Sequence, residues 1–278
     1  MRSPRILRVL RKLPRHAILI VLSAIMLYPL AIVLLTALKS NTEVLLNPTG
    51  LPIEPTLENF ATTWTDGNFT NLFANSILLT GTSMLGATMV ASLAAYAIVR
   101  RANRIGSGIY LLITAGIFLP MQLAIIPQFR VVRDLGLVDN YLSVILIYIV
   151  GAIPFGTFLM AGFMRQIPSE IVEAAIVDGT SYFQLYWRIF FPLTRPAIVT
   201  FWILHGVSVW NDYLIPLLFL ADPHKRTLTT GVLAFKQQYL AQWGNLMAGV
   251  VIMIVPVLIL FILAQRYFVR GLYAGAVK

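Results

Sequence analysis

Few side chains in the apolar part of this chain could do chemistry, and three of them are consecutive: Trp210, Asn211 and Asp212. Asp212 is the one acidic residue within or at the end of a stretch that is apolar enough to cross a membrane. A carboxylate there is costly, so it usually faces a cavity or a partner. A flat aromatic ring beside an amide and a carboxylate could hold a sugar through stacking and hydrogen bonds to hydroxyl groups.

A simpler interpretation places Asp212 at the outer membrane interface, with Trp210 as an interfacial anchor. We favour a structural or gating role for Asp212 over direct contact with a solute. Asn211, Asp212 and Tyr213 project from one turn, so at most some of them can face a pathway. His205 is the only histidine within a span, and a packed, hydrogen-bonded residue explains it better than a proton relay does.

Several kinds of catalytic site are excluded by the residues that are missing from the sequence. The chain has no cysteine, hence no disulfide framework and no thiolate metal site. It has no G-x-x-x-x-G-K-[ST] phosphate loop and no H-E-x-x-H pair. We therefore predict no catalytic residue, no metal site and no cofactor bound by this chain, and any use of ATP would need a separate polypeptide.

Residues 168–196 are polar enough to leave a membrane, although long apolar runs flank them. Ser169 is the expected N-cap of a first short helix, and Glu170 and Glu173 lie in its early turns, where the helix dipole favours carboxylates. Gly179 suits a left-handed C-terminal cap. Asp178 fits poorly near the negative end of that helix. It needs either a local backbone amide, which is the interpretation we favour, or a cation from a partner.

A second short helix should follow directly. Ser181 and Gln184 have the spacing of a capping box. Pro192 is expected to end this helix, and Pro196 is expected to restart the chain as the next membrane span. The sequence therefore predicts a helix-turn-helix that lies against one face of a membrane.

The composition predicts an all-α membrane protein. Apolar residues make up 58% of the chain and charged residues 12%, whereas soluble domains carry about 25% charged residues. Six segments are long enough to cross a bilayer, which takes about 20 apolar residues. They are residues 17–38, 72–99, 107–129, 141–164, 197–220 and 245–268. The polar helix-turn-helix lies between the fourth and the fifth.

The basic residues indicate the orientation of these spans, because cytoplasmic loops carry an excess of lysine and arginine. With the N-terminus in the cytoplasm, six of the 21 basic residues fall on the outer side. These six are Lys39, Arg130, Arg133, Lys225, Arg226 and Lys236. The net charge of +10 is then a topology signal rather than a nucleic-acid footprint. Both termini and the helix-turn-helix are predicted to be cytoplasmic.

Three domain-level expectations follow. Residues 1–16 form a basic cytoplasmic N-terminus, residues 17–268 form one six-span domain with its cytoplasmic loop at 165–196, and residues 269–278 form a cytoplasmic tail. The first apolar stretch is too long for a cleaved signal sequence, so we expect it to be retained. The outer segment 39–71 is either a solvated linker or a docking surface for an external partner.

Four prolines fall within the predicted spans, at Pro120, Pro127, Pro154 and Pro256. Proline breaks the hydrogen-bond ladder of a helix, and membranes tolerate this where neighbouring helices or a water-filled cavity satisfy the freed carbonyls. Each proline alone suggests a kink for packing. The four together indicate a bundle that bends around a pathway.

The run Glu173-Ala174-Ala175-x-x-Asp178-Gly179, with Pro192 after it, resembles the E-A-A-x-x-D-G loop of bacterial ABC importer permeases. Thr180, where alanine is common, is a mild departure. Further stretches are similar to the carbohydrate-uptake branch, and most closely to the six-span partner in maltose-type and glycerol-phosphate-type inner-membrane permeases. They are Leu119-Pro120-Met121-Gln122, Ile126-Pro127, Leu135-Gly136-Leu137, Ile153-Pro154-Phe155, Trp210-Asn211-Asp212 and the tail 271–278.

The resemblance implies that the 165–196 loop docks into a cleft of a cytoplasmic ATPase subunit. Glu173 would face a cation there, Ala174 and Ala175 would allow close approach, and Gly179 would shape the turn. The tail, from Gly275 to Lys278, would also reach the ATPase dimer, which carries the ATP and Mg²⁺. The other implied partners are a second permease subunit, for which this branch favours a sister chain, and an extracytoplasmic solute-binding protein.

The leading hypothesis is thus a permease subunit of the bacterial inner membrane that imports a sugar or sugar-like solute by alternating access. A polyol, a phosphorylated glycerol or a compatible solute is the alternative cargo. An ion-coupled secondary carrier would need more ion-binding groups than Asp212 and His205 supply. An intramembrane enzyme would need paired catalytic groups, which the spans lack. The sequence identifies neither the solute nor the state of the permease pair.

Overall fold

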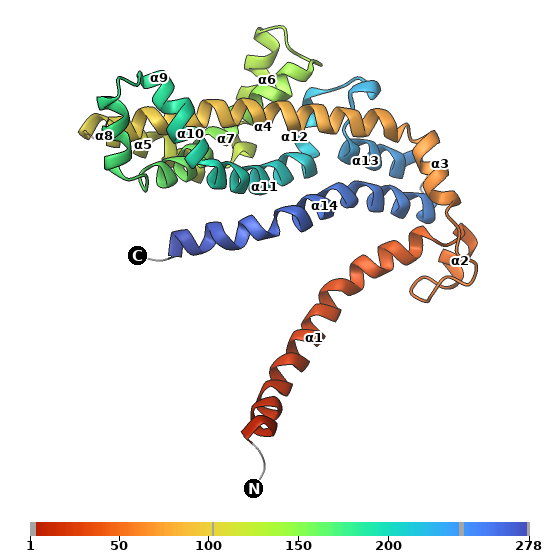
Figure 1. Cartoon of the computed structure of the whole chain (residues 1–278). Coiled ribbons are helices and arrows are strands. Elements are labelled where there is room, and N and C mark those ends of the chain that lie inside the picture. Colours follow the sequence, from red (N-terminus) through yellow and green to blue (C-terminus); the bar gives the residue numbers. More distant parts are fainter. Residues whose placement is uncertain (1–3, 102, 239–241, 277–278) are drawn as a thin grey trace. The chain divides into compact units, whose positions relative to one another are not determined.

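The computed structural model describes residues 4–101, 103–238 and 242–276, and for 4–15, 234–238 and 263–276 it describes the backbone alone. These residues form helices and loops, and no strand occurs among them (Figure 1). The chain divides into two compact units. The first holds the N-terminal part through Phe69 together with Val232–Val255, and the second holds Thr70–Gly231 and the chain from Pro256 onward.

The first unit contains α1 (Pro4–Ala37), α2 (Asn41–Leu46), α3 (Glu58–Asp66) and the adjoining parts of α13 (Leu228–Gln238) and α14 (Trp243–Ala276). Polar contacts fold the segment 39–71. The Asn59 side-chain amide donates to the carbonyls of Ala37 and Lys39, both at 2.8 Å, and Thr63 Oγ1 donates to the Asn245 carbonyl at 3.0 Å. The segment is therefore folded rather than a solvated linker, and its docking role remains a prediction.

The second unit contains the remaining helices. They are α4 (Phe69–Arg100), α5 (Arg104–Ala115), η1 (Gly116–Phe118), η2 (Met121–Ala124), α6 (Ile125–Asp134), α7 (Tyr141–Met164), α8 (Ser169–Val177), α9 (Tyr182–Leu185), η3 (Tyr186–Phe190), α10 (Phe191–Leu193), α11 (Arg195–Asn211), α12 (Leu214–Phe219) and η4 (Pro223–Lys225).

The core of the second unit lies where α4, α7 and α11 meet. A Cβ on Gly156 of α7 would lie 2.8 Å from Ala91 Cβ of α4 and 3.1 Å from the Phe201 ring of α11.

Replacing Gly156 with leucine should therefore destabilise the second unit. The added side chain has no room between three closely packed helices, and overpacking of this kind costs about 1–3 kcal/mol. Thermal unfolding of the purified protein measures the loss. Gly162→Leu is the matched control in the same helix, because no heavy atom lies within 4 Å of a Cβ added there. Equal melting temperatures for the two variants would contradict this account of the core.

Among the described residues, four helical segments are long and apolar enough to cross a membrane: His16–Ala37, Phe69–Arg100, Tyr141–Met164 and Trp243–Ile262. The number rises to six if each of two bent helix pairs counts as one span. The predicted span 141–164 coincides with α7, which Asn140 caps by accepting a hydrogen bond from the Leu142 amide at 2.9 Å. In α1 the apolar window has no buried residue.

The ends of the chain are more helical than expected. Helix α1 begins at Pro4, within the predicted N-terminal region 1–16. Helix α14 runs to Ala276 and so includes Gly275 and most of the predicted tail 269–278. Lys278 lies outside the described residues.

The predicted third span, 107–129, is not one continuous helix. Helix α5 and η1 end before Pro120, η2 and α6 follow, and the two halves meet at 90°. Leu119 is extended, with φ −91° and ψ 111°, because a residue that precedes proline is disfavoured in the helical region. A hydropathy window detects the apolar residues on both sides of this break but not the break itself.

The predicted fifth span, 197–220, is also divided. Helix α11 ends at Asn211, and the short helix α12 begins at Leu214. Pro216 has no N–H to donate to the Asp212 carbonyl four residues before it. That carbonyl instead accepts a hydrogen bond from Thr229 Oγ1 at 2.8 Å. The predicted span 197–220 thus consists of two helices, with the break at Asp212.

Candidate functional site

The helix pair α8–α9 contains the E-A-A-x-x-D-G pattern, and Gly179 forms its turn. Gly179 has φ +77°, a left-handed conformation that glycine adopts without strain. Its amide donates to the Ile176 carbonyl and the Thr180 amide donates to the Ala175 carbonyl, both at 3.0 Å. These two bonds are a Schellman motif. The predicted left-handed cap at Gly179 is confirmed.

The predicted start of α8 was wrong by one residue. Pro168, with φ −56° and ψ 137°, occupies the N-cap position, and Ser169 is the first helical residue. No side chain caps this end. Because Ser169 already has helical backbone angles, its hydroxyl cannot take the place of an N-cap oxygen, which comes from an extended residue.

The second short helix begins as predicted. Ser181 Oγ accepts from the Gln184 amide at 3.3 Å, and Gln184 Oε1 accepts from the Ser181 amide at 3.1 Å. Pro192, however, does not end it. A π-helical turn, η3, precedes this proline, with the Phe191 amide bonded to the Tyr186 carbonyl five residues back. The wider turn relieves the clash that proline causes in an α-helix. The helix then runs to Leu193 and bends by 65° into α11.

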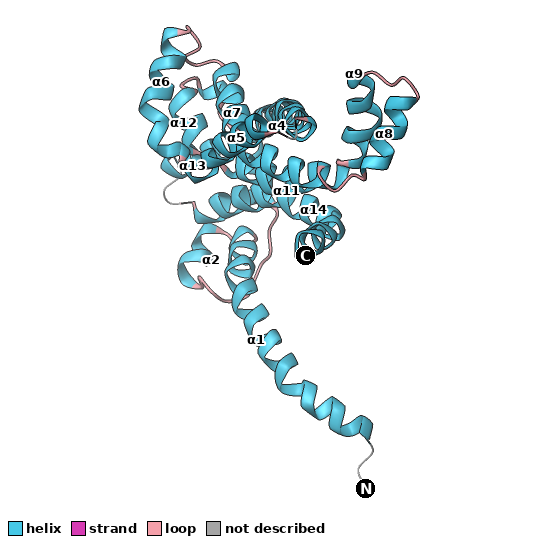
Figure 2. Cartoon of the chain, turned by 90° about the vertical axis from the view of Figure 1, so that its left-hand side faces the viewer, coloured by secondary structure: helices cyan, strands magenta, loops and turns pink. Residues whose placement is uncertain are grey.

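Aromatic and polar contacts hold α9 and η3 to the end of α4. Tyr96 Oη donates to the Tyr182 carbonyl at 2.9 Å, and the hydroxyls of Ser92 and Tyr186 are 2.7 Å apart. The Arg100 guanidinium lies 4.5 Å from the centre of the Tyr182 ring. In the second unit, α8 and α9 lie side by side and project from one end (Figure 2). The pair is thus a projection with a fixed base.

The residues of the pattern differ in exposure. Glu173, Ala174 and Asp178 are exposed, whereas Ala175 is half-buried and packs against the core of the second unit. In the part of the chain that the structure describes, the carboxylates of Glu173 and Asp178 have no hydrogen bond or ion pair. The local cap that we favoured for Asp178 is therefore absent there. Both carboxylates are exposed to solvent, on a surface that also carries Ala174 and the exposed apolar side chains of Ile171, Ile176 and Val177.

A second feature is a cavity of about 800 Å³, here called the kink pocket. The break between α5 and α6, the middle of α7 and the end of α11 form its walls, and both Pro120 and Pro154 line it. Close packing shapes it, since a Cβ on Gly116 would lie 2.9 Å from Pro154 Cγ. Two of the four prolines thus border this pocket. The polar side chains that line it are Gln122, Gln128, Tyr148, His205, Ser208, Asn211, Asp212 and Tyr213.

Asp212 is bound at the wall of this pocket. Its Oδ2 accepts from the Tyr148 hydroxyl at 3.0 Å, and its Oδ1 accepts from the Leu214 amide at 2.9 Å. Tyr148 is only 6% exposed, so Asp212 satisfies a hydroxyl that is almost fully buried. The second bond ties this carboxylate to Leu214, the first residue of α12. The geometry gives Asp212 a structural role, while contact with a solute remains a prediction.

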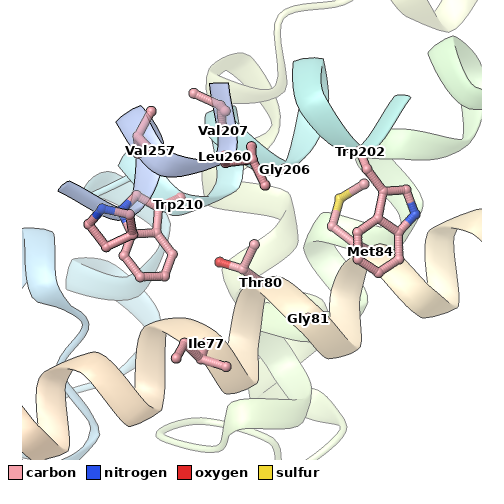
Figure 3. A pocket seen from close by; sticks show the side chains of 11 residues that line it. Ile77, Thr80, Gly81, Met84, Trp202, Gly206, Val207, Trp210, Val257 and Leu260 are labelled. Atoms are coloured by element: carbon pink, nitrogen blue, oxygen red, sulfur yellow. The ribbon is translucent and has the colours of Figure 1, made fainter. Parts of the chain in front are cut away.

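Trp210 lies away from its two neighbours in the sequence. It lines a separate pocket of about 240 Å³ between α4, α11 and α14, here called the apolar pocket. Figure 3 shows Trp210 and Trp202 at opposite ends of this pocket, with Thr80 pointing toward it from α4. Asn211 and Asp212 line the kink pocket instead. The three residues therefore do not form one shared sugar platform.

Sequence reasoning gave no role to the pocket residues Gln128 and Ser208, and it noted Gln122 only within a motif. One signal could have found the two glutamines, since they are polar residues in an apolar segment that two prolines interrupt. Ser208 gave no such signal, because single serines are common in membrane helices.

An ionic cluster joins two loops of the second unit. Asp139, in a left-handed conformation with φ +56°, accepts through Oδ1 from the amides of Ala221 and Asp222 at 3.0 and 3.1 Å. Lys225 Nζ lies 3.0 Å from Asp139 Oδ2 and donates to the Asp139 carbonyl at 2.6 Å. The Asp139 amide in turn bonds to the Phe219 carbonyl at 3.1 Å. The loop after α6 is thereby fixed to the end of α12, and both helices contribute residues to the kink pocket.

This cluster should make part of the stability depend on pH. The Asp222 backbone amide, followed by Lys225, lowers the pKa of Asp139. The stabilisation is fully present above the ordinary aspartate pKa of about 3.9, and it is lost as pH falls through the lower folded-state pKa. Asp139→Asn should therefore lower the melting temperature near neutral pH, with a difference that shrinks below about pH 4. A difference that stays constant with pH would contradict a role for the Asp139 charge.

These features define the class of protein: a helical protein with segments apolar enough to cross a membrane, broken helices around a pocket lined in part by polar side chains, and a projecting helix pair. The chain belongs to the family described as the inner membrane component of binding-protein-dependent transport systems, which matches residues 87–273.

Individual relatives agree with this family. The probable starch degradation products transport system permease protein AmyC of Thermoanaerobacterium thermosulfurigenes is 35% identical, over 93% of this chain and 94% of that protein. The diacetylchitobiose uptake system permease protein NgcG of Streptomyces coelicolor is 31% identical, over 95% of this chain and 88% of that protein. A bacterial ABC transporter involved in the import of the acidic polysaccharide alginate has the same fold, with a TM-score of 0.80 and 24% identity over 96% and 98% of the two chains.

Proposed function

We propose that this chain is the membrane-spanning subunit of an ATP-driven importer for a sugar or sugar-like solute, with the ATPase on a separate polypeptide. Family membership supports the importer class, and the names of the relatives AmyC and NgcG support a carbohydrate cargo. The observation that carries the proposal is the projecting α8–α9 pair, whose exposed Glu173 and Ala174 have no role within the described fold.

In this proposal six spans cross the inner membrane, each bent pair counts as one span, and both termini lie in the cytoplasm. The positions of the basic residues support that orientation. Contacts within the second unit agree with it, because the predicted cytoplasmic ends of α4 and α9 meet at Arg100 and Tyr182, and the predicted outer loops meet at Asp139 and Lys225.

The partners follow from the same reasoning. A pair of ATPases would bind α8 and supply ATP with its Mg²⁺, and a second permease subunit, which we expect to be a sister chain, would complete the pathway. The apolar window of α1, with no buried residue, suits a helix that faces lipid or that second subunit. An extracytoplasmic solute-binding protein would deliver the cargo, in line with the description of the family.

The mechanism would be alternating access. ATP binding closes the ATPase dimer, draws the α8–α9 pairs together and opens the spans outward. A ligand shifts such an equilibrium only through different affinities for the two states, so α8 must contact the ATPase differently in each. The fixed base of the pair at the end of α4 would transmit this movement to the spans.

Reconstitution tests the proposal. The importer in liposomes, with its ATPases, its second permease subunit and its binding protein, should accumulate solute only when ATP and the binding protein are both present. An ionophore that removes the proton gradient should leave uptake unchanged. Uptake that persists without ATP and requires the proton gradient would instead identify an ion-coupled carrier and reject the importer proposal.

A further inference from the structure

Several polar side chains in the kink pocket have no hydrogen-bond partner among the residues that the structure describes. Gln122, Ser208 and Asn211 are exposed and line this pocket, and none of them makes a side-chain hydrogen bond to another described residue. Gln128 Oε1 is shielded from solvent and also has no hydrogen-bond partner among those residues. Buried polar atoms are normally paired, so this oxygen needs an explanation. Amide and hydroxyl groups can both donate and accept, as binding of hydroxyl groups requires.

Among the described residues, the formal charge of the lining of the kink pocket is negative. Among the described residues around this pocket there is no lysine and no arginine, and Asp212 is the only carboxylate. Bonds from Tyr148 and Leu214 hold that carboxylate in place, and no cation pairs with it in the described chain. His205 also lines the pocket and stacks on the Phe201 ring, with the ring centres 5.6 Å apart.

We propose that the kink pocket is a transport subsite for an uncharged, hydroxyl-rich solute, and that Asp212 disfavours anionic solutes there. This inference rests on the proposed import function and adds the charge class of the cargo. The unpaired groups of Gln122, Ser208 and Asn211 bind hydroxyls. The apolar walls lower the local dielectric constant, so the repulsion between Asp212 and an anionic solute is stronger than it would be in water.

The fold alone does not determine whether the transported solute is charged or uncharged. The alginate transporter has the same fold and is involved in the import of an acidic polysaccharide. Function resides in the side chains of a site rather than in the fold that carries it. In this chain the pocket has neutral hydrogen-bonding groups and a carboxylate, and its described lining lacks the arginine or lysine that would bind an acidic sugar.

Direct binding to the complete importer tests the inference. The purified complex with its ATPases, without nucleotide and without the binding protein, is titrated with two probes of equal length, neutral maltotriose and anionic trigalacturonate. Leaving out the binding protein removes its own selectivity. Wild-type protein should bind maltotriose at least about tenfold more tightly, as expected for repulsion by one nearby charge.

Three variants sharpen the test. Asp212→Asn should tighten trigalacturonate binding by about fivefold or more, while maltotriose binding changes little. Asn211→Ala should weaken maltotriose binding by about fivefold, as expected for the loss of one hydrogen bond. Val207→Ala is the matched control on α11, because Val207 lines the apolar pocket, and it should leave both affinities unchanged.

Three results would overturn the inference. These are equal or tighter binding of trigalacturonate to the wild type, no binding of either probe, and no gain in trigalacturonate affinity with Asp212→Asn. Each is separable from failure of the import proposal. A complex that still shows ATP-driven uptake but prefers the anionic probe would reject the charge class alone.

Discussion

Replacing Gly179 with leucine is expected to abolish ATP-driven uptake while the protein still inserts into the membrane. Gly179 has φ +77°, and no heavy atom lies within 4 Å of a Cβ added there. The effect therefore comes from backbone strain of about 1–2 kcal/mol rather than from a clash. Relief of that strain would break the Schellman bonds and redirect α8 relative to α9. Uptake is measured against the amount of protein in the membrane.

Two further substitutions isolate the backbone conformation. Gly179→Asn should retain much of the uptake, because asparagine tolerates the left-handed region. Gly108→Leu places the same side chain on α5, also with nothing within 4 Å, and should behave as wild type. Normal uptake by Gly179→Leu would show that the shape of this turn does not matter for coupling.

Reversing the charge of Glu173 should have the second largest effect. Glu173 is exposed and has no ion pair in the described chain, so lysine at this position should leave the fold unchanged. If Glu173 faces a cation on the ATPase, the substitution replaces an attraction with a repulsion. Affinity for the ATPase should fall by about tenfold or more, corresponding to about 1.4 kcal/mol or more. Binding of the purified ATPase to the permease in nanodiscs measures it.

Glu170→Lys is the matched control for this variant. Glu170 is also exposed and lies on the same helix, one turn before Glu173. The same charge reversal there should change the affinity much less, because Glu170 lies outside the E-A-A-x-x-D-G pattern. Equal losses for the two variants would mean that overall charge, rather than a specific contact at Glu173, controls docking.

Local signals in the sequence predicted much of the fold. Asn140 caps α7 and fixes its start, so the predicted span 141–164 matches the structure. The left-handed Gly179 and the Ser181–Gln184 capping box were also correct, because each depends on residues a few positions apart. The cytoplasmic position of this segment remains a prediction.

Features that depend on distant contacts could not be predicted in this way. Pro120 and Pro192 mark interruptions of the helical hydrogen bonds, but these residues alone did not predict the 90° angle at the first or the π-helical turn before the second. The separation of Trp210 from Asp212 depends on which face of α11 meets α4 and which meets α7. Their adjacency in the sequence suggested one site, but Trp210 lies in α11 and Asp212 just past its end, and they line two different pockets.

The central claim is that α8 lies in the cytoplasm and docks on an ATPase, and labelling of a single cysteine tests it directly. The chain has no cysteine, so Ala174→Cys introduces a unique thiol at an exposed position of α8. A membrane-impermeant maleimide should label it in inside-out vesicles but not in intact cells, and added ATPase should shield it. Glu54→Cys, on the predicted outer segment, should show the opposite sidedness. Labelling of the Ala174→Cys variant in intact cells, or no shielding by the ATPase, would contradict the claim.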